Sequence, residues 1–247
     1  MTDPGQGPET PDSPAAQGRQ PIFLLPGSVT VLIGVLVAIQ LADTLVFNEF
    51  TRQLFTVWFA FIPARLLASE SIPGGLLPLL WTPFTHAFLH AGFEHLLLNS
   101  AWLAIFATPV ARRYGAWPTL AIFLLSAAAG AIAFGVTTLP EIQILVGASG
   151  GVSGLTGAAV RFIFQPLVVG RDPDTEEPVV LGRHLASLRQ LFANPRSRNF
   201  TLFWIILNAA VPLLPAFTGA PLSVAWQAHL GGFVAGLLLA PLFERRG

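Results

Sequence analysis

The sequence predicts an all-α membrane protein, built as a bundle of six transmembrane helices with a long first loop. Two observations lead to this prediction. Hydrophobic residues make up 53% of the 247 residues and charged residues only 11%, which is too apolar for a soluble domain with an ordinary surface. The apolar residues also occur in long blocks, and a helix of about 20 apolar residues spans the hydrocarbon core of a bilayer.

Windows of about 20 apolar residues define the expected spans. These windows are 22–42, 93–111, 117–138, 145–165, 199–217 and 223–243. The stretch from Phe50 to His90 is apolar as well, but Pro63, Arg65 and the turn sequence SIPGG interrupt it. We therefore expect a long first loop with amphipathic helical pieces in the membrane interface, and a seventh span is the alternative.

Two polar segments complete the expected domain organisation. Residues 1–20 are rich in proline, glycine and polar residues and bury too little apolar surface to fold, so we expect a disordered tail followed by one membrane domain over 21–247. The segment at about 166–198 lies between the fourth and fifth spans and includes RDPDTEEP and RQLFANPRSR. Its mixed charges predict a solvated loop.

The distribution of arginine predicts the orientation, because cytoplasmic loops of membrane proteins carry an excess of basic residues. If the N-terminus is inside, only Arg52 and Arg65 of the 13 basic residues lie outside. We expect a multi-pass protein of the cell membrane, in bacteria the inner membrane, with both termini in the cytoplasm. A formal net charge of zero gives no pull toward nucleic acid, and the absence of cysteine excludes disulfides and thiolate metal sites.

Polar side chains inside the predicted spans identify candidate site residues, because such groups are costly in hydrocarbon. His95 and Asn99 lie in the second span, Ser149 in the fourth and His229 in the sixth. These spans run in the same direction, and the four residues fall in their first turns, so topology places them at one depth near the outer face. A serine hydroxyl, an imidazole base and further hydrogen-bond donors suffice for acyl transfer.

Small residues predict how these spans meet. The sequence GASGGVSGLTGA around Ser149 has a face of small residues, and the span of His229 carries a G-x-x-x-G pair. Such faces let two helices approach closely, so we expect Ser149 and His229 to come within hydrogen-bonding distance. The glycines expected to pack at the site are Gly147, Gly150, Gly232 and Gly236.

Three motifs in this order resemble the rhomboid family of intramembrane serine proteases. FTHAFLHAGFEHLLLN is similar to the H-x-x-x-N signature of the family's second helix, at His95 and Asn99. Gly147-Ala148-Ser149-Gly150 matches its G-x-S-G nucleophile motif, and AHLGGFVAGLLLA matches the helix of its catalytic histidine, here His229. The resemblance runs from the first span to the C-terminus and implies a six-helix rhomboid-like bundle.

The resemblance also implies an activity. It predicts a serine endopeptidase with a Ser149–His229 dyad and no third acid, and an oxyanion site made by His95, Asn99 and a backbone N–H. The expected partners are the lipid bilayer and transmembrane protein substrates, typically single-span, that are cut near the outer membrane boundary. No cofactor and no metal are expected. The first-loop Trp-Arg pair of the family reads Trp81-Thr82 here, which leaves the anchoring of that loop open.

Other interpretations exist for the serine motif. Gly151-Val152-Ser153-Gly154 also fits G-x-S-G, but Ser153 lies one turn deeper, where a small packing residue is the simpler interpretation. The sequence around Ser149 also satisfies G-x-S-x-G, the nucleophile elbow of α/β-hydrolases. That elbow requires a strand before the serine, whereas the flanks here are membrane spans.

The remaining polar residues have structural alternatives. His95 and Asn99 would then only support the bundle by hydrogen bonds. His86 and His90 are four residues apart, and together with His95 they could suggest a metal site on a helix. The only neighbouring carboxylate is Glu94, so we expect these histidines to pack in the loop instead. Asn208 in the fifth span is expected to hydrogen-bond between helices, with no catalytic role.

Two further functions compete with the protease. Some rhomboid-like proteins are catalytically silent and bind membrane clients, but such members lose the serine or the histidine, and both are present here. A transporter or channel also places polar groups inside the membrane, yet it predicts repeats or broken helices in matching halves, and the sequence contains no internal repeat.

Overall fold

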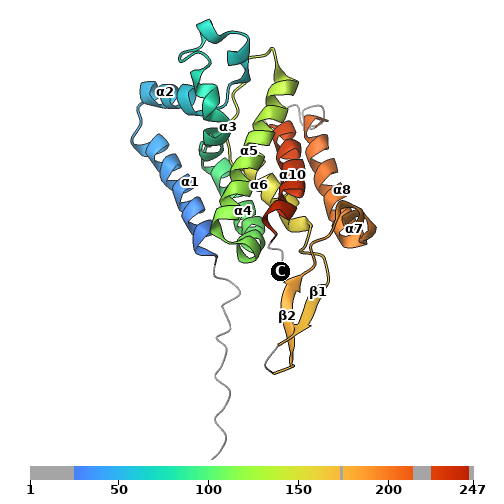
Figure 1. Cartoon of the computed structure of the whole chain (residues 1–247). Helices are drawn as coiled ribbons and strands as arrows, with labels where there is room; N and C mark the ends of the chain where they lie inside the picture. The colour runs from blue at the N-terminus through green and yellow to red at the C-terminus, as the bar shows by residue number, and fades with distance from the viewer. Residues whose placement is uncertain (1–24, 173–174, 214–223, 245–247) are drawn as a thin grey trace, which may run out of the picture.

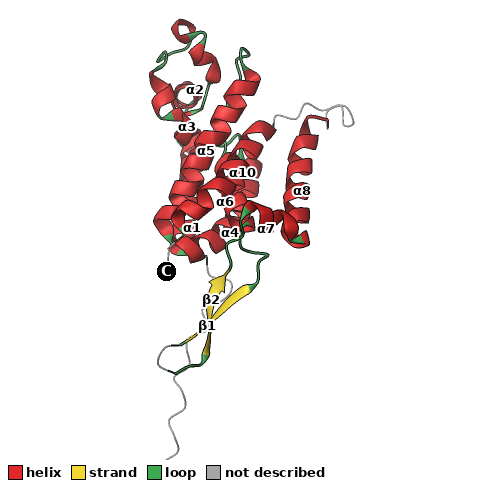
Figure 2. Ribbon diagram, turned by 45° about the vertical axis from the view of Figure 1, so that its right-hand side comes forward, coloured by secondary structure: helices red, strands yellow, loops and turns green. Residues whose placement is uncertain are grey.

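The computed structural model describes residues 25–172, 175–213 and 224–244, so the tail predicted for residues 1–20 lies outside the described residues. The chain forms a helical bundle with one two-stranded sheet at one end (Figures 1 and 2). Each predicted span overlaps one helix of the bundle. These helices are α1 (Gly27–Leu45), α4 (Phe93–Tyr114), α5 (Ala116–Thr138), α6 (Ser149–Val160), α8 (Pro195–Ala210) and α10 (Trp226–Leu239).

Within the described ranges, three helical stretches are long and apolar enough to cross a membrane. They are Gly27–Leu45, Ala116–Thr138 and Trp226–Phe243, the last of which joins α10 to the short helix η6 (Ala240–Phe243). Helix α4 is as long, but it carries Glu94 at its start and two arginines at its end. Helices α6 and α8 are shorter, so the prediction of six membrane-spanning helices stays a prediction for α4, α6 and α8.

Helix α6 lies at the centre of the bundle. All of its residues from Gly150 to Val160 are buried, and α4, α5 and α10 pack around it (Figure 2). At 1.5 Å per residue the helix is only about 18 Å long, which is shorter than a bilayer core of about 30 Å. A helix enclosed by protein need not reach across the hydrocarbon, because its ends are not presented to lipid.

Glycines let α6 and α10 meet backbone to backbone. A Cβ atom added at Gly232 would overlap the carbonyl of Gly150, and one added at Gly236 would overlap the carbonyl of Gly154. From the other side, a Cβ at Gly157 would overlap the carbonyl of Phe233. No side chain larger than hydrogen fits at these crossing points, so the glycines fix how closely the two helices pack.

The stretch between α1 and α4 is built of short helices. The longest is α2 (Glu49–Phe59), whose first turn is capped by the Asn48 side chain, which accepts a hydrogen bond from the Thr51 N–H at 2.8 Å. At about 16 Å, α2 is too short to span a bilayer. The others are η1 (Pro63–Leu66), η2 (Ser69–Ser71), η3 (Leu77–Leu80), α3 (Thr82–Thr85) and η4 (His86–Phe88).

A buried arginine anchors this first loop. Arg65 is 0% exposed, and its guanidinium donates to the carbonyls of Pro73 at 2.7 Å, Gly75 at 3.0 Å and Val57 at 2.6 Å. It joins the end of α2 to the turn that follows η2. The missing arginine after Trp81 therefore does not leave the loop without an anchor, because Arg65 reaches the loop carbonyls from a different position.

The Trp81 side chain adds a second attachment in the same region. Its indole N–H donates to the carbonyl of Trp58 at 2.8 Å, and the two rings are stacked with centroids 6.2 Å apart. Thr82, which follows it, is completely buried. Together Arg65 and Trp81 fix the loop relative to α2.

The segment predicted as a solvated loop contains a β-hairpin, so the expectation of an all-α protein is wrong there. Strands β1 (Leu167–Arg171) and β2 (Pro178–Arg183) pair antiparallel, and α7 (Leu188–Ala193) follows. The physical reason is visible in the sequence. LVVGR and PVVLGR are rich in β-branched residues and flank a polar turn, which is the pattern of a hairpin, although the charges of that turn dominate the composition of the segment.

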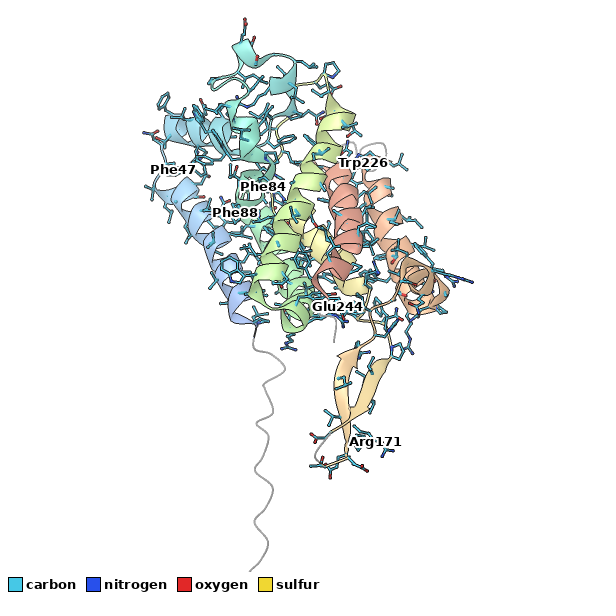
Figure 3. The ribbon with its side chains drawn as sticks, in the orientation of Figure 1. Phe47, Phe84, Phe88, Arg171, Trp226 and Glu244 are labelled. Carbon is cyan, nitrogen blue, oxygen red and sulfur yellow. The ribbon has the colours of Figure 1, made fainter. Side chains whose placement is uncertain are left out.

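The two ends of the bundle carry different elements. Helix α1 begins and α10 ends at the end that carries the hairpin, whereas α2 and the first loop lie at the opposite end (Figure 1). Figure 3 shows Glu244 and Arg171 toward the hairpin end and Trp226 and Phe47 toward the first-loop end. Arg113 at the end of α4 pairs with Glu244 through Nε at 3.0 Å and donates to the carbonyl of Arg183 at 2.7 Å, which joins the hairpin to the bundle.

Candidate active site

Ser149 is the first residue of α6, at the end of the bundle that faces the first loop. The chain just before it is held by that loop, because Leu145 exchanges backbone hydrogen bonds with Phe61 at 2.9 and 3.1 Å and the N–H of Gly147 donates to the carbonyl of His86 at 2.9 Å. The structure thus begins the helix four residues later than the predicted span and places the serine at the helix N-terminus.

Gly147 is required by its surroundings. Its φ angle is +118°, a conformation that favours glycine. A Cβ atom there would lie 2.6 Å from Cε1 and 2.9 Å from Nε2 of His95. The imidazole of His95 therefore packs directly on the backbone two residues before the serine.

The N-terminus of α6 presents the backbone N–H groups of its first turn beside Ser149. The residue at the N-cap is Ala148, and no side chain caps the helix. The first N–H groups of a helix have no partner inside the helix, and a serine, threonine or aspartate at the N-cap would normally bind one of them. An uncapped N-terminus beside Ser149 leaves these donors, and the positive end of the helix dipole, for an anion.

His95 and Asn99 lie on α4, one turn apart. The Nδ1 atom of His95 accepts a long hydrogen bond from the N–H of Ala91 at 3.4 Å. A neutral imidazole that accepts at Nδ1 carries its hydrogen on Nε2, so the nitrogen nearest Gly147 is a donor. Asn99 is buried, and its amide donates to the carbonyl of His95 at 2.9 Å, which leaves one amide hydrogen for another acceptor.

His229 lies in the first turn of α10. Its Nδ1 atom is 2.7 Å from Oδ1 of Asn208 on α8, and the Asn208 amide nitrogen donates to the carbonyl of Trp204 at 2.9 Å. Sequence reasoning gave Asn208 no catalytic role. The available signal was its amide within a predicted span, but nothing in the spacing indicated which helix it would contact.

The backbone contacts bring the helices of Ser149, His95 and His229 together. A Cβ atom at Gly150 would lie 3.5 Å from the carbonyl oxygen of Ala228, the residue before His229, while Gly147 contacts His95. Ser149 thus lies between two residues that touch the helices of both histidines. Within the described ranges the Ser149 hydroxyl makes no hydrogen bond, and such contacts are often loose before a substrate binds.

The other two histidines of this region, His86 and His90, make buried contacts with Thr82 and His95. His86 is 1% exposed, its Nδ1 lies 3.0 Å from the carbonyl of Thr82, and burial lowers its pKa to about 4. The ring of His90 packs edge-on against His95 with centroids 5.2 Å apart, and burial together with His95 lowers the pKa of His90 to about 4. In the part of the chain that the structure describes, no three acidic or histidine side chains are arranged to hold a metal ion.

Known proteins are similar to the part of the chain that contains these site residues. The sequence model of the rhomboid domain matches residues 78–169 and 179–246, which is more than half of the chain. Rhomboid protease GlpG of Pectobacterium atrosepticum is 29% identical over 161 residues, which cover 65% of this chain and 48% of the relative. RHOMBOID-like protein 1 of Arabidopsis thaliana is 28% identical over 165 residues, which cover 66% and 34%.

A shorter match has a higher identity. Putative rhomboid protease YdcA of Bacillus subtilis is 36% identical over 93 residues, which cover 37% of this chain and 46% of the relative. In each of these comparisons the chain spans less than half the length of the relative. The matched residues of the rhomboid domain include all four predicted site residues and Asn208.

Proposed function

The chain belongs to the rhomboid family, and from this premise we propose that it is an intramembrane serine endopeptidase that cuts other membrane proteins with Ser149 as nucleophile. The observation that carries the proposal is the position of Ser149. It is a partly exposed serine at an uncapped helix N-terminus, and its neighbours in the chain touch the helices of two histidines. Two of the relatives are named as proteases.

His229 is proposed as the general base. As Ser149 attacks the carbonyl carbon of the scissile peptide, Nε2 of His229 takes the hydroxyl proton and then gives it to the leaving amine, which leaves an acyl-enzyme. A water molecule, deprotonated by the same nitrogen, hydrolyses the ester and returns Ser149 to its free state. Among the described residues the Ser149 hydroxyl makes no hydrogen bond, and we expect its contact with Nε2 of His229 to form when a substrate binds.

The oxyanion of the tetrahedral intermediate needs donors that are already in place. The free N–H groups in the first turn of α6 provide backbone donors on the side of Ser149. The Nε2–H of His95 lies beside Gly147, and the remaining amide hydrogen of Asn99 is one turn further along α4. We propose that His95 is the closer side-chain donor and that Asn99 contributes mainly by holding the backbone of α4.

Ser149 is preferred over Ser153 on exposure. Ser153 is 2% exposed and is enclosed by the helices that pack around α6. A nucleophile must reach a substrate carbonyl, and a serine in the middle of a closely packed helix cannot. Ser153 is proposed as a packing residue.

The orientation proposed for the bundle places the site near the outer face of the membrane. The arginines at the ends of α4 and of the hairpin lie at one end of the bundle, whereas the chain just before Ser149 is bonded to the first loop at the other end. Of the two arginines at the outer end, Arg65 is buried and Arg52 is paired with Asp43 and Glu49. This distribution supports cytoplasmic termini and cleavage of single-span substrates near the outer boundary.

The test is labelling of Ser149 by a fluorophosphonate probe, together with cleavage of a labelled single-span substrate in liposomes. The proposal expects labelling and cleavage by the wild-type protein, loss of both in Ser149→Ala and His229→Ala, and retention of both in Ser153→Ala. Cleavage that survives Ser149→Ala would contradict the mechanism. If the wild-type protein binds the substrate but is neither labelled by the probe nor able to cut the substrate, it is the alternative, a catalytically silent member of the family that binds membrane clients.

A further inference from the structure

Asn208 has the contacts of a residue that orients a catalytic base. It lies near the end of α8 and is only 6% exposed. Its amide group is bound on both sides, by the carbonyl of Trp204 one turn earlier in the same helix and by the imidazole of His229 on α10. A buried amide in a helix of a membrane bundle is costly unless it is bonded in this way.

The bond to Trp204 determines which atom of Asn208 faces the histidine. A backbone carbonyl only accepts hydrogen bonds, so the atom 2.9 Å from the Trp204 oxygen must be the amide nitrogen. The atom 2.7 Å from His229 Nδ1 is then the amide oxygen, which only accepts. It follows that Nδ1 of His229 carries the hydrogen, and that the lone pair of the neutral imidazole is on Nε2.

We propose that Asn208 is a positioning residue that holds His229 in the tautomer and the orientation in which Nε2 acts as the base for Ser149. This inference rests on the proposed function, and it replaces the predicted two-residue dyad by a Ser149–His229–Asn208 arrangement. A neutral amide oxygen behind a catalytic histidine also occurs in Cys-His-Asn proteases. An amide fixes the tautomer without adding a negative charge inside the membrane.

The packing of α8 against α10 does not depend on this hydrogen bond. One turn below it, the ring of Trp204 stacks on Phe233 of α10 with centroids 6.1 Å apart and an interplanar angle of 22°. Trp204 also meets Trp102 of α4 edge-on at 5.5 Å. These aromatic contacts hold the two helices together, so a variant of Asn208 is expected to stay folded while the imidazole loses its partner.

The electrostatic surroundings of His229 make a pH test informative. Among the described residues, the titratable group that acts on it is His95 of α4, and Asn208 of α8 is neutral. A carboxylate placed at Asn208 would face the imidazole directly and would stabilise its protonated form. Because the base must be neutral to accept the serine proton, the acid limb of the pH profile would then move to higher pH.

The experiment measures the second-order rate constant for fluorophosphonate labelling of Ser149 as a function of pH. The variants are Asn208→Leu, which keeps the shape and removes the bond, and Asn208→Asp, which keeps the acceptor and adds a charge. Thr201→Val is the matched control, since Thr201 is buried on the same face of α8, two turns from Asn208. The melting temperature of each variant in detergent reports folding.

The expected result is a fall of about 10- to 100-fold for Asn208→Leu, because part of the general-base contribution is lost. Asn208→Asp is expected to keep most of the rate with its acid limb at higher pH, and Thr201→Val is expected to match the wild type. Labelling of Asn208→Leu at the wild-type rate, or an unchanged acid limb in Asn208→Asp, would overturn the inference. Absence of labelling in the wild type would instead overturn the proposed function itself.

A second measurement does not depend on activity. In protein labelled with ¹⁵N-histidine, the signals of protonated and unprotonated ring nitrogens are distinct, and the His229 signals are identified by their loss in His229→Gln. The wild type is expected to carry hydrogen on Nδ1 of His229, and Asn208→Leu is expected to shift the equilibrium toward the other tautomer. Hydrogen on Nε2 of His229 in the wild type would contradict the orientation of Asn208.

Discussion

The carbonyl oxygen of Gly150 on α6 lies so close to Gly232 on α10 that a methyl group at Gly232 would overlap it. The contact joins the residue after Ser149 to a residue one turn after His229. Both sides of it are backbone, which cannot rotate away as a flexible side chain does. The distance between the proposed nucleophile and base is therefore set by the absence of a side chain at Gly232.

We expect Gly232→Ala to destabilise the protein by about 1–3 kcal/mol, the usual effect of overpacking, and to reduce labelling of Ser149 by fluorophosphonate because the helices must separate. The measurements are unfolding in detergent and the labelling rate. Gly34→Ala is the control, since Gly34 lies in α1 and has no atom within 4 Å of an added Cβ. Equal stability and labelling of the two variants would show that the α6–α10 contact is looser than described.

Sequence patterns were sufficient for the parts of this site that depend on local features. The helices of the bundle follow from runs of apolar residues, and the glycine faces follow from the helical repeat, which places Gly232 and Gly236 one turn apart. The start of α6 at Ser149 did not follow, because it depends on backbone pairing between Leu145 and Phe61, which are 84 residues apart. Contacts over such distances leave no periodic signal in the chain.

Arg65 is predicted to contribute far more to stability than Arg52, although both are arginines at the first-loop end of the bundle. Arg65→Met would leave the carbonyls of Pro73, Gly75 and Val57 without their donor, and we expect a loss of about 2–4 kcal/mol. Arg52→Met removes ion pairs to Asp43 and Glu49 and one hydrogen bond to the Asp43 carbonyl, on a side chain that is itself partly exposed, with an expected change of about 1 kcal/mol. Unfolding in detergent compares the two, and similar losses would contradict the anchoring role.

The anchoring of the first loop shows a limit of motif comparison. The absence of an arginine after Trp81 is visible in the sequence, but its replacement by Arg65 is not, because positions 65 and 82 are 17 residues apart and only the fold brings Arg65 to the loop carbonyls. The contact between Asn208 and His229 is likewise created only by the fold. In both cases the sequence shows a polar residue in an apolar stretch, but it does not show which group that residue binds.

His86 predicts a specific loss of stability in acid. Burial lowers its pKa to about 4 in the folded protein, compared with about 6.5 in an unfolded chain. Between these values the unfolded state binds a proton that the folded state does not, so stability falls as pH falls from about 6.5 to 4, by up to about 3 kcal/mol. His86→Gln should reduce this slope. Unfolding measured at several pH values between 4 and 7 checks it.

The hairpin β1–β2 is predicted to be dispensable for the chemistry. It extends from the end of the bundle opposite to α2 and the first loop (Figure 1), and most of its residues are exposed. Val169 pairs with Val180, so residues 170–179 can be replaced by Asn-Gly, a two-residue turn that joins paired strands. The attachment of Arg113 to the carbonyl of Arg183 remains in this variant.

The shortened protein is expected to label at Ser149 at the wild-type rate and to unfold within about 1 kcal/mol of the wild type, because surface changes away from buried contacts have small effects. The matched control replaces Arg113 by methionine, which removes the pairing with Glu244 and the bond to Arg183 and should destabilise more. Slower labelling of the shortened protein at unchanged stability would mean that the hairpin acts on the site from the far end of the bundle, through residues 161–166, which join α6 to β1 and bind Arg183 at the Gln165 carbonyl.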